Sequence, residues 1–171
     1  MTQSPTKRLA FLSMFAALSL GIYALESFIP NPIPIPGIKL GLANIITLVV
    51  FKKYGFRDAA LVLVVRILLS ALLFGSLYSM LYSLTGGALC LAMEYAVDRF
   101  LKGKAIYVTG IFGAIFHNAG QVLVAFLITS LPQVWIYIPY LLVAAIITGF
   151  ITGMAAHFTL KLLNRLPVFG S

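Results

Sequence analysis

The sequence predicts an all-α integral membrane protein in which a single domain of 171 residues forms six transmembrane helices. Hydrophobic residues make up 61% of the chain and charged residues only 9%. Soluble domains carry about 25% charged residues, so this composition excludes an ordinary soluble fold. Four prolines alternate with other residues between positions 30 and 36. Proline removes backbone donors and interrupts helices, so this run is expected to be a stiff extended loop outside the hydrocarbon.

Each membrane span needs about 17 to 25 residues. The first apolar stretch follows Lys7 and Arg8, as in a signal peptide. It is about 20 residues long and has no convincing small-residue cleavage site, so we interpret it as an uncleaved first span. Residues 58–100 form one apolar block with a break only at 74–76, so the third span is short. The predicted spans are 8–29, 38–52, 58–74, 79–100, 105–130 and 135–163.

The distribution of basic residues predicts the orientation of the chain, because lysine and arginine concentrate in cytoplasmic connections. Lys39 lies alone on the side of the proline loop, and Arg66 falls inside a span. Both termini are therefore expected in the cytoplasm. The same distribution explains the net charge of +8 without a nucleic-acid partner. The basic residues on the side of the N-terminus are Lys7, Arg8, Lys52, Lys53, Arg57, Arg99, Lys102, Lys104, Lys161 and Arg165.

Ionisable residues inside the spans are candidates for function, because each is costly to bury. Arg66 and Glu94 lie about 13 and 9 Å from the cytoplasmic ends of neighbouring antiparallel spans, at about 1.5 Å per residue. We therefore predict an ion pair between them, with Asp98 one turn below Glu94 as a second acceptor. Two interpretations stay open: a structural clasp, or an arginine that binds an acidic substrate group or gates a path.

A second polar group is expected in the outer half of the membrane. His117 and Gln121 are four residues apart and share one face of the fifth span, with Asn118 beside them. Asn44 has a similar depth in the second span, and Lys39 lies nearer the surface, beneath the proline loop. These residues are predicted to line a ligand-binding pocket. The alternative is that the amides simply hydrogen-bond neighbouring helices.

Aromatic residues also gather near the outer ends of the spans. An interfacial aromatic belt explains such residues. Alternatively, some of them form a stacking surface for a flat or isoprenoid ligand, and Tyr82 and Tyr140 are the candidates that we assign to the ligand site. The residues concerned are Tyr78, Tyr82, Trp135, Tyr137 and Tyr140.

Two spans carry stripes of small residues at intervals of four. Such stripes let helix backbones approach closely, either inside the bundle or against another membrane protein. The stripe of the first span is Ser13, Ala17 and Gly21, and that of the sixth is Ala145, Gly149 and Gly153.

Three motifs carry a resemblance to known proteins: residues 38–44 (IKLGLAN), 83–87 (SLTGG) and 116–121 (FHNAGQ). With them, most of the chain resembles the bacterial family labelled heptaprenyl diphosphate synthase component I, also called Gx transporter. The six spans, the proline-rich outer loop and the small-residue first helix are similar to the substrate-binding S components of energy-coupling-factor (ECF) vitamin transporters.

The resemblance implies an S-component fold in the bacterial cytoplasmic membrane, with a small-molecule ligand bound from outside under the first outer loop. It also implies docking of Ser13, Ala17 and Gly21 onto a membrane coupling subunit that ATPases drive. A rival hypothesis is an accessory, non-catalytic membrane subunit in isoprenoid, quinone or electron-transfer metabolism. A channel that uses Arg66 and His117 is a third reading, which the scarcity of ionisable residues disfavours.

The acidic residues argue against catalysis by this chain. Prenyl diphosphate synthases need paired aspartates to hold magnesium, whereas the four acids here are never adjacent. There is no Walker A loop, so ATP hydrolysis would belong to a partner. The single cysteine, Cys90, excludes an internal disulfide and a cysteine-based metal site. We expect neither enzyme activity nor a cofactor or metal.

Overall fold

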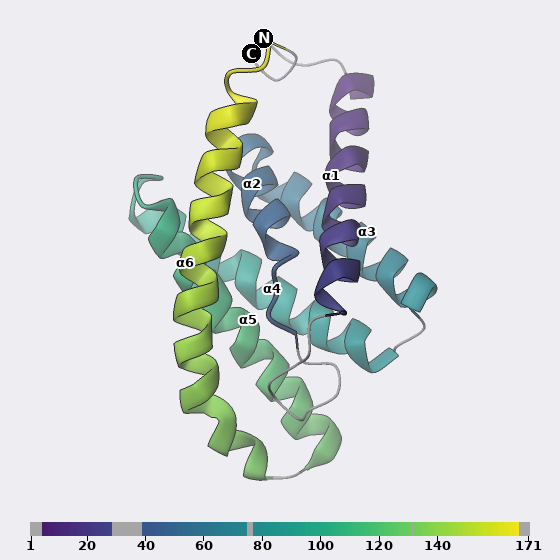
Figure 1. The fold of residues 1–171 in the computed structure, drawn as a ribbon, viewed down its shortest axis with the longest axis vertical. Coiled ribbons are helices and arrows are strands. Elements are labelled where there is room, and N and C mark those ends of the chain that lie inside the picture. The colour runs from purple at the N-terminus through teal and green to yellow at the C-terminus, as the bar shows by residue number, and fades with distance from the viewer. Residues whose placement is uncertain (1–4, 29–38, 75–76, 131, 168–171) are drawn as a thin grey trace.

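The structure, a computed structural model, describes residues 5–28, 39–74, 77–130 and 132–167. These ranges contain helices and no strands, which confirms the predicted all-α class. The predicted proline loop falls within 29–38, outside the described residues. The helices are α1 (Pro5–Glu26), α2 (Asn44–Tyr54), α3 (Phe56–Phe74), α4 (Leu77–Phe100), α5 (Ile106–Thr129), the 3-10 helix η1 (Pro132–Tyr137) and α6 (Ile138–Leu163) (Figure 1).

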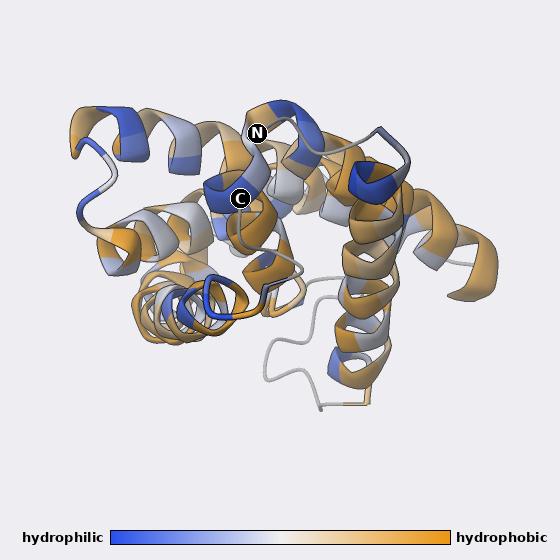
Figure 2. Ribbon diagram, turned by 90° about the horizontal axis from the view of Figure 1, so that it is seen from above, coloured by the Kyte–Doolittle hydropathy of each residue, from blue (hydrophilic) through white to orange (hydrophobic). Residues whose placement is uncertain are grey.

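Four of these helices, α1, α4, α5 and α6, are long and apolar enough to cross a membrane. The helix α3 has 19 residues but carries Arg57, Asp58 and Arg66, which lower its apolar character. Large apolar side chains cover the outward faces of the bundle. Seen from the end where α1 begins, the helices are mostly coloured hydrophobic, and hydrophilic segments lie mainly at helix ends and connections (Figure 2). The chain is therefore a membrane protein. Exposed examples are Leu61, Leu68, Leu72, Leu127, Val143, Ile147 and Phe158.

The helix α2 is shorter than the predicted second span, 38–52. Its 11 residues rise only about 16 Å, roughly half of the hydrocarbon thickness. Residues 39–43 form a turn instead, in which Gly41 has φ +81°, a conformation that residues with a Cβ rarely adopt. The middle of α2, from 48 to 50, is completely buried. The helix therefore lies inside the bundle, packed against α1, α3, α4 and α6.

Ion pairs place several helix ends together at one end of the bundle. Arg8, near the start of α1, binds Asp58 at the start of α3, with Nη2 and Oδ1 2.6 Å apart. Lys52, near the end of α2, binds Asp98 near the end of α4, also at 2.6 Å. The start of α1 and the end of α6 lie at this same end (Figure 1). Successive helices therefore alternate in direction, and the basic connections share one side.

Cysteine labelling can test which side this is. In a Cys90→Ala background, cysteines at Ile35 and Gly75 are expected to react with a membrane-impermeant maleimide in intact cells. Cysteines at the exposed positions Arg57 and Lys104 should react only after permeabilisation, because they lie at the end with the basic connections. External labelling at Lys104 would contradict the proposed orientation.

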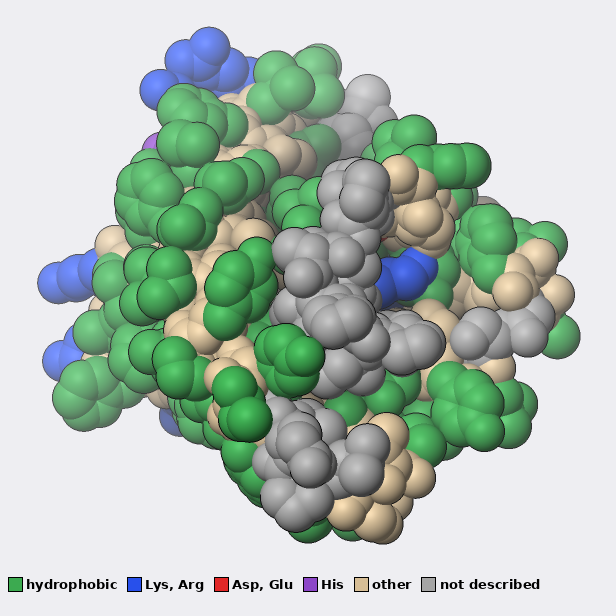
Figure 3. Space-filling view, turned by 60° about the horizontal axis from the view of Figure 1, so that its bottom comes forward, with side chains coloured by type: hydrophobic (Ala, Val, Ile, Leu, Met, Phe, Trp, Pro, Cys, Tyr) green, Lys and Arg blue, Asp and Glu red, His purple; other side chains and the backbone are tan. Residues whose placement is uncertain are grey.

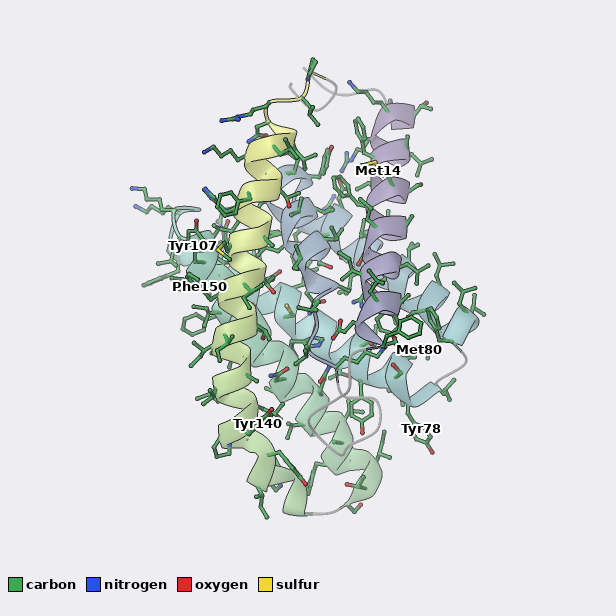
Figure 4. All side chains as sticks on the ribbon, viewed as in Figure 1. Met14, Tyr78, Met80, Tyr107, Tyr140 and Phe150 are labelled. Atoms are coloured by element: carbon green, nitrogen blue, oxygen red, sulfur yellow. The ribbon has the colours of Figure 1, made fainter. Side chains whose placement is uncertain are left out.

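The small-residue stripe of α6 packs inside the bundle. A Cβ added at Gly149 would lie 2.5 Å from Ile111 Cα, and one at Gly153 would lie 2.7 Å from Tyr107 Cα. The backbones of α5 and α6 therefore touch. Close by, the rings of Tyr107 and Phe150 stack with centroids 5.7 Å apart (Figure 4). This stripe is used for internal packing, one of the two uses that the sequence left open.

The stripe of α1 has the opposite environment. Ser13, Ala17 and Gly21 are all exposed, and a Cβ added at Gly21 would meet nothing within 4 Å. The other face of α1 packs on the bundle through buried residues such as Phe15 and Tyr23. The exposed stripe is therefore not needed for contacts within the described part of the chain.

Candidate ligand-binding site

A chain of hydrogen bonds joins the turn at 39–43 to α2 and α5, away from the end with the ion pairs. Asn44 Nδ2 lies 3.2 Å from His117 Nδ1, and Gln121 Nε2 lies 2.8 Å from His117 Nε2. The backbone N–H of Lys39 donates to Gln121 Oε1 at 3.3 Å. Asn44, His117 and Gln121 are all buried. Four of the predicted site residues thus come together, as their depths in the sequence indicated.

The two ring nitrogens of His117 determine which groups donate and which accept in this chain of hydrogen bonds. Gln121 accepts from Lys39 through Oε1, so its amide N–H₂ faces His117 Nε2 and donates to it. A neutral imidazole has one donor and one acceptor, so Nδ1 of His117 carries the hydrogen. The structure places Asn44 Nδ2 at this nitrogen and leaves Asn44 Oδ1 without a partner among the described residues, so a half-turn of the carboxamide would give Nδ1 an acceptor.

Two glycines frame the imidazole of His117. A Cβ at Gly41 would lie 2.9 Å from the ring, and a Cβ at Gly86 of α4 would lie 2.9 Å from Nδ1. Both residues therefore have to lack a side chain for the ring to sit between α4 and the turn before α2. This explains why glycines stand within two of the motifs that the sequence analysis singled out.

Glu26, at the end of α1, holds the same turn. Its Oε1 accepts the backbone N–H of Gly41 at 2.6 Å, and its Oε2 accepts that of Leu42 at 3.0 Å. About two turns earlier on α1, Ser19 Oγ donates to the carbonyl of Ala43 at 3.2 Å. A buried carboxylate that accepts two backbone N–H groups is well stabilised, so the turn at 39–43 is tied firmly to α1.

Two cations converge on the ring of Tyr23 in α1. Lys39 Nζ lies 3.5 Å from the ring centroid and Arg66 Cζ 5.8 Å from it. Such contacts stabilise a cation over an aromatic ring. The Tyr23 hydroxyl shares a hydrogen bond of 2.6 Å with Ser79 Oγ, and Lys39 Nζ donates to Ser27 Oγ. Figure 3 shows this end of the bundle, with basic surface in the middle of a mainly apolar face.

The predicted ion pair between Arg66 and Glu94 is wrong for the structure described here: the described ion pairs are Arg8–Asp58 and Lys52–Asp98. Arg66 faces α1 and Tyr23. The Glu94 carboxylate faces α5 instead, where a Cβ at Gly113 would lie 2.8 Å from Oε1. The two side chains point to different neighbours because each helix is rotated differently about its axis.

Glu94 borders a small internal cavity. Its Oε1 accepts a hydrogen bond from the Cys90 thiol at 3.5 Å, and its Oε2 has no hydrogen-bond partner. Asn44 and Thr152 line the same cavity, whose volume is about 10 Å³. A space of this size holds about one water molecule, so it is too small for an organic ligand.

The other predicted ligand residues lie elsewhere. Asn118 donates to the carbonyl of Leu141 in α6 at 3.0 Å, as an interhelical bond. Tyr82 is buried in an apolar cluster with Leu141 and residues of α5. Tyr140 is 51% exposed on the lower part of α6 (Figure 4). None of the three joins the chain around His117.

Asn118 and Leu141 also border an apolar groove of about 280 Å³ between α5 and α6. Its walls are almost wholly hydrocarbon, with Trp135 near one end and Ala145 deeper along α6. The groove can accept an apolar chain and offers very few hydrogen bonds.

The role of α1 in the site was not predicted from the sequence. Ser19, Tyr23 and Glu26 all contact the turn at 39–43 or its lysine. Their spacing of four and three residues puts them on one helical face, opposite the small-residue stripe. That periodicity was the available signal: a serine, a tyrosine and a glutamate on one face of an otherwise apolar span.

The site offers hydrogen-bonding groups and cations, which suit binding. Among the residues that the structure describes, no three His, Cys, Asp or Glu side chains gather as a metal site. Asp58 and Asp98 form ion pairs at the other end of the bundle, and Glu26 is bonded to backbone. The arrangement can hold a polar or anionic molecule by hydrogen bonds and charge.

Comparison with known proteins places the chain in a family. No curated protein and no solved structure matches it. The model of one protein family, described as heptaprenyl diphosphate synthase component I, matches residues 15–159. This range includes the turn at 39–43, His117, Gln121 and all of the exposed α1 stripe except Ser13. Because the match covers most of its length, the chain belongs to the heptaprenyl diphosphate synthase component I family.

Proposed function

We propose that the protein is the membrane-embedded, non-catalytic substrate-binding subunit of an ECF-type importer for a small organic molecule. The observation that carries this proposal is the hydrogen-bonded chain in which the buried Asn44, His117 and Gln121 meet the backbone of Lys39, in the turn that follows the proline loop. Ligand sites are mostly apolar with a few placed polar groups, and this cluster supplies such groups within an apolar bundle.

The exposed stripe of α1 supports a coupling partner. Ser13, Ala17 and Gly21 lie on the outside, where small side chains let a second helix approach closely. The comparable stripe of α6 is already covered by α5, so the two stripes have different tasks. The proposed occupant of the α1 stripe is a helix of the membrane coupling subunit, which ATPases would drive.

Bulky substitutions on the stripe test this docking. Gly21→Leu and Ala17→Leu are expected to abolish co-purification of a coupling subunit and its ATPases, because a leucine holds the helices apart. The thermal stability of the isolated protein should stay within about 0.5 kcal/mol of wild type, since these positions are exposed. A matched control is Met14→Ala, an exposed change beside the stripe. Unfolding of the Gly21→Leu variant would instead assign the stripe to internal packing.

Native mass spectrometry of the purified protein tests the proposal as a whole. A bound small molecule together with a coupling subunit and ATPases would support an importer. Purification with a prenyl transferase or a redox protein, and without ATPases, would contradict it.

The apolar groove between α5 and α6 favours a second candidate function. With its volume of about 280 Å³ and hydrocarbon walls, it suits an isoprenoid chain. In that reading the protein is an accessory membrane subunit that presents a prenyl chain to a catalytic partner, as the family description of a synthase component implies. Asn118, at the groove, would then matter for ligand binding more than Asn44 or Gln121.

A further inference from the structure

Arg66 is buried, and one edge of its guanidinium group makes no hydrogen bond to the described residues. The residue is 3% exposed, and its Nε and Nη2 atoms have no hydrogen-bond partner among the residues that the structure describes. Leaving a buried donor unsatisfied destabilises the fold, and the cost is larger for a charged group. A structural arginine would be expected to have its partners within the bundle.

The two empty atoms form one edge of the guanidinium, and this edge is the one that binds a carboxylate elsewhere in the chain. In Arg8, Nε donates to Asp58 Oδ2 at 2.9 Å and Nη2 donates to Oδ1 at 2.6 Å. Such a fork matches two oxygens of a carboxylate or a phosphate group. Arg66 thus presents the same fork, and no carboxylate of the described residues binds it.

The carboxylate of Glu26, which lies near Arg66, already accepts two hydrogen bonds from the backbone. Glu26 interacts electrostatically with Arg66, but its two oxygens accept the N–H groups of Gly41 and Leu42. Lys39 adds a second cation on the ring of Tyr23. Two cations and one committed carboxylate leave a net positive charge of one around Tyr23. This charge suits an anion from outside the chain.

We propose that Arg66, assisted by Lys39 and Tyr23, binds an oxyanion group of the ligand, a carboxylate or a phosphate, through the Nε and Nη2 fork. The inference rests on the proposed function, because it assigns the chemical class of the molecule that the same end of the bundle would capture. The polar chain around His117 then contacts the uncharged part of that molecule.

Thermal unfolding of the purified protein in detergent tests the oxyanion site. The probes are sodium acetate, phosphate and pyrophosphate, compared with sodium chloride at equal ionic strength. At roughly ten times its Kd, a bound oxyanion is expected to raise the Tm of the wild type by about 3 to 6 °C. A response to acetate alone indicates a carboxylate ligand, and one to the phosphates alone indicates a phosphorylated ligand. No difference between any oxyanion and chloride would overturn the proposal.

Substitutions assign the response to Arg66. Arg66→Lys keeps the charge but removes the fork, so oxyanion affinity should fall about 10-fold or more. Arg8→Lys is the matched control, because it alters an equivalent fork at the other end and should leave the oxyanion response intact. Lys39→Gln should weaken the response without abolishing it. Equal responses in Arg66→Lys and wild type would refute the assignment.

Stability without ligand provides an independent readout. Because Arg66 is an unpaired buried charge, Arg66→Gln is expected to match or exceed the Tm of the wild type in chloride. An arginine that serves only structure would show a loss instead, and such a loss would contradict the proposal. If Arg66→Gln does not fold, that result counts as the same contradiction. Oxyanion binding without co-purifying ATPases would support the Arg66 site and contradict the importer. Co-purifying ATPases without oxyanion binding would support the importer and contradict the Arg66 site.

Discussion

Replacing Gly149 with alanine is expected to destabilise the protein by about 1 to 3 kcal/mol, and replacement with valine to prevent stable folding. The added Cβ would lie 2.5 Å from Ile111 Cα and 2.7 Å from the carbonyl oxygen of Gly110. Both contacts are with backbone, so no side-chain rotation relieves them and α5 and α6 must separate. Thermal unfolding in detergent measures the loss.

Gly21→Ala is the matched control for this prediction. It makes the same chemical change in the middle of another membrane helix, but its Cβ meets nothing within 4 Å. Alanine has the higher helix propensity, so the Tm should be unchanged or slightly raised. If Gly149→Ala is as stable as Gly21→Ala, then α5 and α6 do not pack through their backbones as described.

Asn44→Ala and Gln121→Ala are each expected to weaken binding of the co-purifying ligand by about 5- to 150-fold. This range corresponds to the loss of one buried hydrogen bond, about 1 to 3 kcal/mol. Each variant also removes a partner of His117, so a moderate decrease of the Tm should accompany the loss of affinity. Isothermal titration of the ligand identified by native mass spectrometry measures the change.

Asn118→Ala is the informative comparison for these variants. Asn118 has similar chemistry and lies on the same helix as Gln121, but it bonds the carbonyl of Leu141 and borders the apolar groove. The importer proposal expects it to lose stability and keep ligand affinity. The opposite pattern, with affinity lost in Asn118→Ala and kept in Gln121→Ala, would move the binding site to the groove and favour the accessory subunit.

Much of this architecture could be predicted from the sequence, because apolar length and the positions of glycine, proline and basic residues determine where spans begin and end. The largest error concerns the start of α2, predicted at 38 and observed at Asn44. The apolar residues 40, 42 and 43 read as the beginning of a span. The structure uses them in a turn, since Glu26 takes the backbone N–H groups of Gly41 and Leu42. A tertiary contact of this kind leaves no local signal.

For the polar residues, a contact within one helix could be predicted from the sequence, whereas the contacts of Arg66 and Glu94 between helices could not. His117 and Gln121 were placed together by their spacing of four, and their contact is confirmed. Arg66 and Glu94 were paired by depth alone, which gives one coordinate along the membrane normal. Which way a helix turns its side chains depends on its neighbours. For α3 and α4 that rotation sends Arg66 toward Tyr23 and Glu94 toward Gly113.

The hydrogen bonds between Glu26 and the turn at 39–43 couple the position of that turn to the position of α1. The Glu26 carboxylate binds the turn at the C-terminal end of α1, a helix of 22 residues that is about 33 Å long. The exposed face of this helix carries Ala17 and Gly21. A displacement of this turn would be transmitted to α1 through these two hydrogen bonds and through the bond from Ser19 to Ala43. A rotation or tilt of α1 would then carry the movement to its exposed face.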